Sequence, residues 1–287
     1  SSVKVYSAFR NKTYIEKNMV AYRERKILSM GNDAYEMFEK APADVTVNFP
    51  KAFGMIANLE LQEIVLYSMI RKIDHILGFG ATMYFTVPLD MTAVEKRAYF
   101  HVANGHWLKK NRVFMVEAPI ADAIAMGVNL EDPEGNMIVD IGGGTTEIAV
   151  ISLGGIVSNK SIRIAGDDLT DDIQEYMRHQ HNIRIGERTA EQIKIHVGSA
   201  LSELDEPPAD FIVQGPNQMT SLPVEVPVSY QEIAHCLEKS ISKIEIAILG
   251  ALEQTPPELY ADIVNKGIYL AGGDALLRGL DKRLTDK

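Results

Sequence analysis

The segment 140–147 reads Asp-Ile-Gly-Gly-Gly-Thr-Thr-Glu and combines the residue types of a phosphate-binding loop. Glycine has no Cβ, so the glycines at 142–144 can reach positive φ and let backbone N–H groups converge on a di- or triphosphate. Asp140 cannot bind phosphate itself. It can hold a Mg²⁺ that bridges to phosphate, through water because Mg²⁺ dehydrates reluctantly. The segment therefore predicts a phosphate site with Asp140 beside its metal.

The flanking residues predict that this segment is the bend of a β-hairpin. An apolar run at 137–139 precedes it and a β-branched run at 148–151 follows it. A glycine hairpin without a ligand is the alternative interpretation. Two other nucleotide loops are excluded, because a Rossmann fingerprint needs a third glycine where Glu147 stands and a helix next, and no G-x-x-x-x-G-K-[ST] motif occurs.

Composition limits the class of protein. The 287 residues are 46% hydrophobic and 24% charged, which is ordinary for a globular protein of one large or two smaller domains. The net charge of −10 argues against non-specific nucleic-acid binding and requires that a bound nucleoside triphosphate be held locally. The single Cys236 excludes an intrachain disulfide. No run of eighteen apolar residues or secretory pattern occurs, so we expect a cytoplasmic protein.

The elements that position the glycine segment follow from the hydrophobic pattern. In the first half it predicts alternating strands and helices, which indicates a largely parallel sheet with ligands beyond the carboxyl ends of its strands. The strand 112–116 delivers Glu117 to such an end. The expected elements are a strand-turn-strand unit at 1–16, an insert at 18–56 with strands near 19–22 and 45–47 around a helix, a helix over 59–77, a strand at 83–87, a helix capped by Thr92 and Glu95, and a helix from Pro119 to Met126.

The second half repeats this plan. It predicts three strands at 137–140, 146–152 and 156–164, a helix after Gly166, a helix starting after Thr189 that carries Glu191 and Lys194 on one face, a two-stranded excursion within 206–228, a long helix from 230 to about 252, a strand at 267–271, and a final helix with Leu276, Leu277 and Leu280. Two similar halves should face one another across a cleft. The first half then contains only the far arm of its own phosphate hairpin, so we expect the sequence to begin within a functional loop.

Four segments in order resemble the MreB family, the rod-shape-determining bacterial branch of the actin superfamily. They are 112–117, 135–147, 185–191, and 255–259 followed by Gly272-Gly273. The resemblance covers essentially the whole chain and implies an actin-like α/β fold, with two ribonuclease H-like halves flanking a nucleotide cleft, each with a small subdomain. The implied subdomains are 1–17 and 57–128 (first large), 18–56 (its small subdomain), 129–165 and 237–287 (second large), and 166–236 (its small subdomain).

The resemblance also implies roles for individual residues. Glu117 would orient or activate the attacking water, and Asp140 and Thr145 would act at the metal and phosphates. Read without the family, Glu117 is a helix-start acid, and Glu191 and Lys194 are a solvated helix-surface pair. The implied nucleotide contacts are Ser1, Ser2, Gly142, Gly143, Gly144, Thr145, Gly166, Glu191, Lys194, Gly272, Gly273, Asp274 and Ala275.

Several positions depart from the family pattern. Ala118 stands where a second glutamate is frequent, and Asp274 stands where glycine is usual. If the Asp274 carboxylate faces the α-phosphate it should weaken ATP binding, whereas if it caps the following helix it is neutral; we expect the cap. Leu77-Gly78-Phe79 matches a membrane-binding loop, with a buried helix end as the alternative. The insert 18–56 is short, and the closing strand and helix expected after Lys287 are absent from the sequence.

The function implied is that of an ATP-binding cytoskeletal protein that polymerises into filaments and helps determine bacterial cell shape by organising cell-wall synthesis. Slow ATP hydrolysis coupled to polymerisation, ATP/ADP and Mg²⁺ as cofactors, and a place at the inner face of the membrane follow from the same resemblance. Its partners would be further copies of itself, the cell-wall elongation machinery and the membrane surface, with no nucleic acid. The alternatives are a monomeric superfamily ATPase of the chaperone or kinase type, and a nucleotide-bound scaffold that does not hydrolyse ATP.

Overall fold

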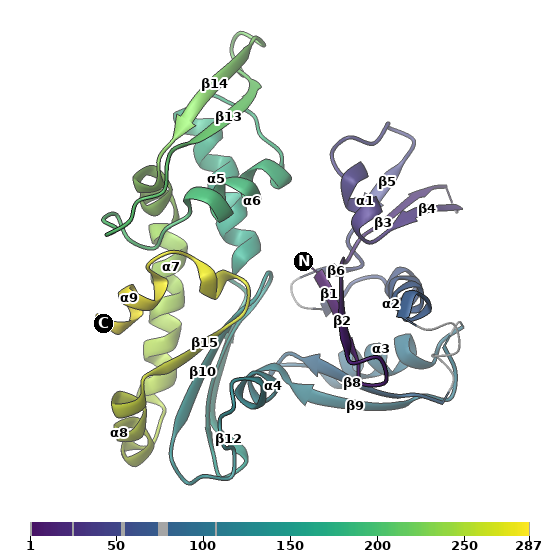
Figure 1. Ribbon diagram of the computed structural model, residues 1–287, viewed down its shortest axis with the longest axis vertical. Helices are drawn as coiled ribbons and strands as arrows, with labels where there is room; N and C mark the ends of the chain where they lie inside the picture. Colours follow the sequence, from purple (N-terminus) through teal and green to yellow (C-terminus); the bar gives the residue numbers. More distant parts are fainter. Residues whose placement is uncertain (1, 25, 53–54, 74–79, 107, 287) are drawn as a thin grey trace. The chain divides into compact units, whose positions relative to one another are not determined.

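The computed structural model describes residues 2–24, 26–52, 55–73, 80–106 and 108–286 (Figure 1). The chain divides into two compact units, Ser1–Glu117 and Ala118–Lys287. Two positions singled out in the sequence lie outside the described residues, namely Ser1, assigned to a phosphate loop, and 77–79, assigned to a membrane contact.

The first unit follows the predicted order of elements. Its opening strands pair as an antiparallel hairpin, and β8 and β9 pair in parallel across the helix α3, both as predicted. The strand β4 within the 18–56 insert was not predicted. The elements are β1 (Ser2–Ser7), β2 (Lys12–Lys17), β3 (Val20–Arg23), β4 (Lys26–Met30), α1 (Asn32–Met37), β5 (Thr46–Asn48), β6 (Lys51–Ala52), β7 (Met55–Ile56), α2 (Leu59–Ile73), β8 (Thr82–Val87), α3 (Ala93–Asn104) and β9 (Arg112–Glu117).

Local sequence signals explain two helices of this unit. In α3 the Thr92 hydroxyl accepts from the backbone N–H of Glu95 while the Glu95 carboxylate accepts from that of Thr92, which is the predicted capping box. In α2 the apolar positions of the helical repeat, among them Val65 and Met69, are buried in the unit's core. The spacing of the apolar residues therefore determines which face of α2 packs into the core.

The second unit carries most of the residues singled out in the sequence. Its strand positions are those predicted to within two residues, and the helix α8 was not predicted. The elements are α4 (Ala118–Ala125), β10 (Asn136–Ile141), β11 (Thr146–Ser152), β12 (Gly155–Ile162), α5 (Gly166–Gln180), α6 (Glu187–Val197), β13 (Phe211–Pro216), β14 (Pro223–Val228), α7 (Tyr230–Glu253), α8 (Pro257–Lys266), β15 (Ile268–Ala271), the 3₁₀ turn η1 (Asp274–Leu276) and α9 (Leu280–Thr285).

The central sheet of this unit has the strand order β12-β11-β10-β15. The first three strands are antiparallel neighbours joined by short turns, and β15 adds to β10 in parallel. Short turns can join only antiparallel neighbours, whereas β15 returns after α5, α6, α7 and α8. The parallel pair places the carboxyl ends of β10 and β15 at the same edge of the sheet.

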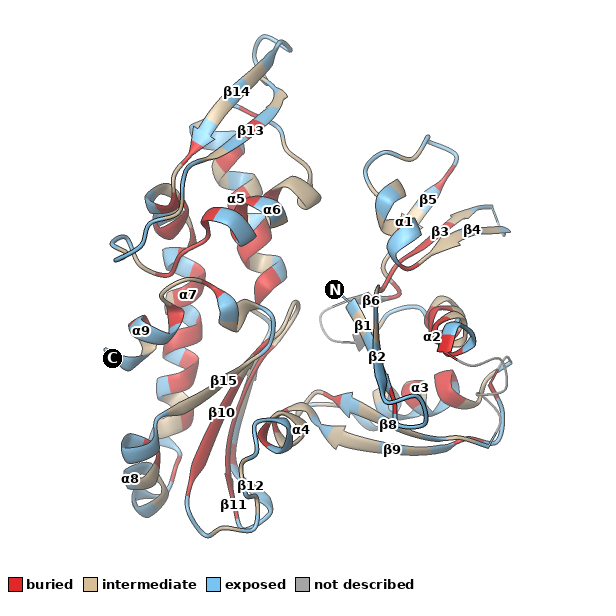
Figure 2. Cartoon of the chain, in the orientation of Figure 1, coloured by how far each residue is buried: buried red, intermediate tan, exposed pale blue. Residues whose placement is uncertain are grey.

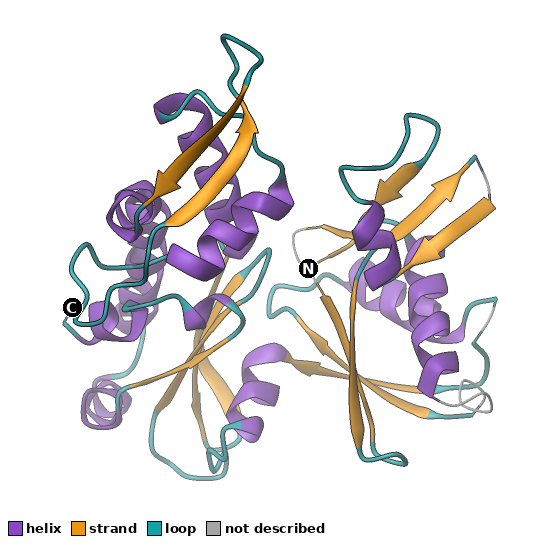
Figure 3. Cartoon of the chain, turned by 45° about the horizontal axis from the view of Figure 1, so that its top comes forward, coloured by secondary structure: helices purple, strands orange, loops and turns teal. Residues whose placement is uncertain are grey.

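Strands β10 and β11 are buried along almost their whole length, as the red ribbon in Figure 2 shows. Helices α5 and α6 lie between this sheet and the β13–β14 hairpin (Figures 1 and 3). The core formed by the sheet with α5 and α7 includes Met137, Val139, Ile148, Val150, Leu169, Ile173, Met177, Ile241, Ile244 and Ile248. A packed core behind both ends of the glycine turn holds the turn in a defined place.

Two predicted helix boundaries in this unit are wrong. Helix α6 begins at Glu187 after the N-cap Gly186, not after Thr189. The segment after β15 is not one helix, because η1 ends at Leu276 and Gly279 has a left-handed φ of 72° before α9 starts. Among the residues that the structure describes, no helix has the length and apolar character needed to cross a membrane.

Candidate functional site

The glycine segment forms the predicted β-hairpin. In the register of β10 and β11, Ile141 pairs with Thr146, which leaves 142–145 as the turn. The turn is closed by a hydrogen bond from the Gly142 N–H to the Thr145 carbonyl oxygen, at 3.0 Å. The Thr146 hydroxyl donates to the Ile164 carbonyl at 2.7 Å and fixes the second arm. The residues assigned to phosphate binding are therefore held on a rigid turn.

The expected use of the glycines, positive φ, is wrong for two of them. Neither Gly142 nor Gly143 has a φ in the left-handed region. They permit close approach instead, because a Cβ at Gly143 would lie 3.3 Å from a carboxylate oxygen of Asp167, and one at Gly142 would lie 3.2 Å from the Thr145 carbonyl. Both distances are tighter than ordinary van der Waals contact.

The start of α5 is hydrogen-bonded to the turn. The N–H of Gly166 donates to the Gly142 carbonyl at 3.0 Å, and that of Asp167 donates to the Gly143 carbonyl at 2.7 Å. These bonds satisfy backbone groups that a helix start otherwise leaves unpaired. The turn and the first residues of α5 thus form one hydrogen-bonded unit.

Lys194 of α6 is the centre of the site. Its side chain is only 8% exposed. The Nζ atom donates to the Gly166 carbonyl at 2.8 Å and lies 2.9 Å from Asp274 Oδ1 and 3.1 Å from Glu191 Oε2. Three acceptors match the three N–H donors of the ammonium group. The Thr170 hydroxyl lies 2.9 Å from both the Gly166 carbonyl and Glu191 Oε2 and completes the network.

The electrostatics of this cluster favour a charged lysine. Burial alone would lower the pKa of Lys194, but the carboxylates of Asp274 and Glu191 outweigh burial and raise it. Burial raises the pKa of Asp274. Lys194 opposes this shift, and the like charges of Glu191 and Asp167 add to it. One lysine is therefore shared among several carboxylates.

The turn after β15 reaches the same place. Asp140 pairs with Ala271 in the parallel register, so Gly272 follows directly beside the end of β10. Gly272 has a φ of 89°, and a Cβ there would overlap the Ile141 carbonyl oxygen and lie 2.5 Å from Asp140 Oδ1. Only glycine combines this φ with so close an approach of two backbones.

The prediction that Asp274 caps the following helix is wrong. Helix α9 starts six residues later with Gly279 at its N-cap, and η1 has no side-chain cap. The Asp274 carboxylate instead pairs with Lys194 and lies against Gly166, where a Cβ on Gly166 would overlap it. Asp274 therefore forms an ion pair with a residue 80 positions away instead of the expected local cap.

The structure thus brings together one group of predicted site residues, all of them in the second unit. The group in the second unit is Asp140, Gly142, Gly143, Gly144, Thr145, Gly166, Glu191, Lys194, Gly272, Gly273, Asp274 and Ala275. Ser2 begins β1 and Glu117 ends β9, both exposed on the first unit, and Ser1 is not described. Sequence reasoning missed Asp167 and Thr170. Thr170 had a signal, since a threonine four residues after Gly166 in a helix can bond back to that carbonyl.

The metal assignment to Asp140 has limited support from protein ligands. Across the described ranges, no group of three or more His, Cys, Asp or Glu side chains is placed to hold a metal ion. A Mg²⁺ at this turn would take most of its ligands from phosphate and water, which fits a single carboxylate acting through water.

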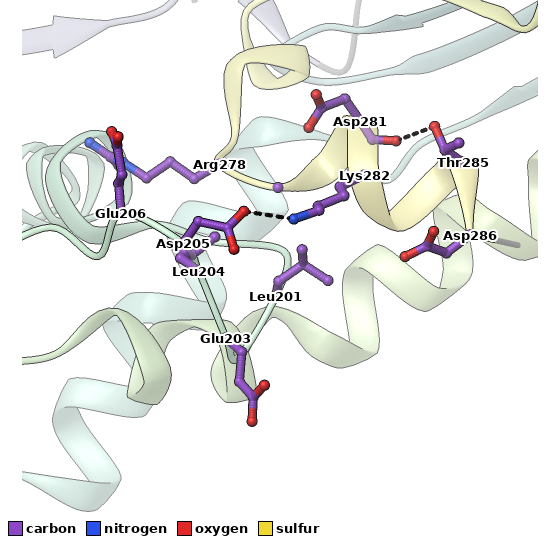
Figure 4. A pocket seen from close by; sticks show the side chains of 11 residues that line it. Leu201, Glu203, Leu204, Asp205, Glu206, Arg278, Asp281, Lys282, Thr285 and Asp286 are labelled. Atoms are coloured by element: carbon purple, nitrogen blue, oxygen red, sulfur yellow. Dashed lines mark hydrogen bonds and ion pairs between the residues drawn. The ribbon is translucent and has the colours of Figure 1, made fainter.

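An open pocket of about 690 Å³ elsewhere in the second unit contains none of the predicted site residues (Figure 4). It lies between the loop 201–206 and α9. The Lys282 ammonium lies 2.8 Å from Asp205 Oδ2 across it. Its walls are formed by solvated side chains rather than by a buried network.

The fold is shared with actin-like proteins of known structure. The chain is similar over its full length to MreB 5 of Spiroplasma citri bound to AMPPNP, with a TM-score of 0.94, 33% identity and coverage of 86% of that chain. It also matches a MamK double helical filament with a TM-score of 0.81 at 20% identity, which shows the fold alone, over 100% of this chain and 87% of that chain. The protein therefore has an actin-like fold.

Sequence comparison narrows this class. The family model described as MreB/Mbl protein matches residues 1–287. The cell shape-determining protein Mbl of Bacillus subtilis is 37% identical over 264 residues, 91% of this chain and 78% of the relative. The cell shape-determining protein MreB of Escherichia coli K12 is 36% identical over 284 residues, 95% of this chain and 80% of the relative. The chain belongs to the MreB/Mbl family.

Proposed function

We propose that this protein is an ATP-binding cytoskeletal protein that hydrolyses ATP slowly, polymerises into filaments, and helps determine cell shape by organising cell-wall synthesis. The observation that carries the proposal is the buried Lys194 cluster, which ties α6, the start of α5 and the turn after β15 to the glycine hairpin. Three segments distant in sequence meet at one turn, and such convergence fixes the positions of groups that could contact a ligand. Two similar structures of MreB5 from Spiroplasma citri, bound to AMPPNP and to ADP, support this ligand class.

In this proposal each element has a separate task. The turn 142–145 holds phosphate oxygens, with Thr145 at the reacting phosphate and Asp140 orienting the water shell of Mg²⁺. Glu191, Lys194, Gly166 and the turn 272–275 support the adenosine side. Ser2 and the preceding Ser1 form part of a further phosphate contact. When bound, Mg²⁺ neutralises phosphate charge, and Glu117 accepts the proton of the attacking water.

The proposed partners follow from the same relatives. Self-association into filaments is proposed together with membership of the MreB/Mbl family, and the names of the MreB and Mbl relatives support a role in cell shape. We include in the proposal the cell-wall elongation machinery, a cytoplasmic location and a peripheral contact with the inner face of the membrane. The four subdomains are proposed at 1–17 with 57–128, at 18–56, at 129–165 with 237–287, and at 166–236.

The test measures phosphate release and light scattering together, after addition of Mg-ATP to the full chain. Slow turnover that accompanies assembly is expected. Turnover without assembly would favour a monomeric ATPase, assembly without turnover a non-hydrolysing scaffold, and the absence of both would remove the proposal.

Glu117 is tested separately from nucleotide binding. Replacing Glu117 by alanine is expected to keep nucleotide affinity and lower turnover by roughly 10²–10⁴-fold, since a general base is lost. Glu60→Ala is the matched control, because Glu60 is also an exposed acid at a helix start of the first unit. Unchanged turnover in Glu117→Ala, or an equal loss in Glu60→Ala, would take Glu117 out of this role.

A further inference from the structure

Asp274 is held beside the glycine turn more tightly than any local signal requires. Its carboxylate is 14% exposed, pairs with Lys194 Nζ at 2.9 Å, and lies against Gly166 in the space that a side chain would occupy. The Gly166 N–H in turn donates to the Gly142 carbonyl. The Asp274 carboxylate therefore lies against Gly166, and Gly166 is hydrogen-bonded to the turn proposed to hold phosphate.

The charges around this turn are unbalanced. Glu191 and Asp274 share the one ammonium group of Lys194, and Asp167 adds a further like charge beside Asp274. The ammonium group already donates to Glu191, Asp274 and the Gly166 carbonyl, so its donors are committed within the protein. Repulsion between a carboxylate and a phosphate grows with each added phosphate charge, and partly buried charges are screened little by salt.

We infer that Asp274 is a specificity-determining residue of the proposed nucleotide site, which sets how strongly affinity depends on the number of phosphates. Its charge weakens binding of the triphosphate more than binding of the diphosphate, and affects the uncharged nucleoside least. The affinities of the site for ATP and ADP therefore differ less than they would without the Asp274 charge. This inference rests on the proposed nucleotide function.

The experiment measures binding of adenosine, ADP and the non-hydrolysable analogue AMPPNP to the full chain by calorimetry in the presence of Mg²⁺. Asp274→Asn removes the charge and keeps the shape of the side chain. We expect about five- to tenfold tighter AMPPNP binding, a gain of about two- to threefold for ADP, and the smallest change for adenosine, as expected for Coulomb repulsion in a partly buried site. Asp281→Asn is the control, since it makes the same change of charge in the first turn of α9, away from the cluster.

The outcomes separate the two proposals. An equal change for all three ligands, or none, overturns the role of Asp274 while nucleotide binding stands. Failure of the unmodified chain to bind ADP and AMPPNP removes the proposed function and the inference with it. Asp274→Ser is a second variant of different shape, and it should reproduce the same dependence on phosphate number if charge is the cause; a different dependence counts against it.

Discussion

Two lysine–carboxylate contacts in the second unit have nearly the same length and different surroundings. Lys194 lies 2.9 Å from Asp274, with side chains 8% and 14% exposed. Lys282 lies 2.8 Å from Asp205, with side chains 59% and 88% exposed. An exposed pair gains little because water and salt screen it, whereas a buried pair leaves a costly unpaired charge when one partner is lost. The distance between two charges therefore does not identify a site, but their burial does.

The pocket beside Lys282 supports the same conclusion. Its volume is about 690 Å³, yet Lys282 lowers the pKa of Asp205 only across a solvated contact at its edge (Figure 4). The Lys194 cluster encloses several polar atoms that satisfy one another and touch the backbone of the glycine turn. The pocket therefore lacks the buried polar network that surrounds the glycine turn.

The largest expected effect comes from removing the buried lysine. Lys194→Met should lower the free energy of unfolding by roughly 3–5 kcal/mol, because it leaves the largely buried carboxylate of Asp274 without its ion-pair partner. Lys282→Met is the matched variant and should leave the urea midpoint unchanged within error. Equal losses in the two variants would show that burial does not separate the two contacts.

An intermediate effect is expected at Gly166, which lies under Asp274. A Cβ there overlaps the carboxylate, so Gly166→Ala should cost roughly 1–3 kcal/mol by overpacking. Adding Asp274→Gly should recover most of that loss in a double-mutant cycle. Gly273→Ala is the control, since Gly273 has a helical φ and a Cβ there meets no atom within 4 Å. Without recovery in the double variant, the contact between Asp274 and Gly166 is not the cause.

The smallest effect concerns pH, and it has opposite signs at the two acids. The pKa of Asp274 is raised in the folded protein, so its contribution to stability falls as pH rises from about 3.8 through that value, and it grows on acidification from neutral pH. The pKa of Asp205 is lowered, so its contribution is present above 3.8 and is lost as pH falls. Urea unfolding between pH 7 and 4 should therefore show the unmodified chain gaining stability relative to Asp274→Asn. Asp205→Asn should show no such gain, and a constant difference from Asp274→Asn would contradict the assigned shift.

Local signals were enough for much of the fold. The capping boxes of Thr92 and Ser229 and the glycine hairpin at 142–145 each depend on residues within a few positions of one another. The strand β4 and the helix α8 were missed, although α8 has two local signals, Pro257 in its first turn and Gly267 after its last residue. Local patterns therefore predict elements better than they predict where elements meet.

The site was predicted only in part, because its contacts are distant in sequence. Glycine at 142 and 143 suggested left-handed backbone, and only the position of Asp167 shows that close packing is the reason. Asp274 was assigned to a local cap because Lys194, eighty residues earlier, could not be seen as its partner. The family resemblance supplied the list of residues, and the geometry supplied their connections.

The parallel pairing of β15 with β10 also has a consequence for the order of folding. β15 starts at Ile268, and Asp274 follows it, so neither the sheet nor the Lys194 cluster can be completed until the chain has been synthesised beyond Asp274. Contacts of such high sequence separation form late and slowly. Until then, the edge of β10 that pairs with β15 would be unpaired, and unpaired strand edges can associate with other chains. The site would then form at the same stage of synthesis as the pairing of β10 with β15.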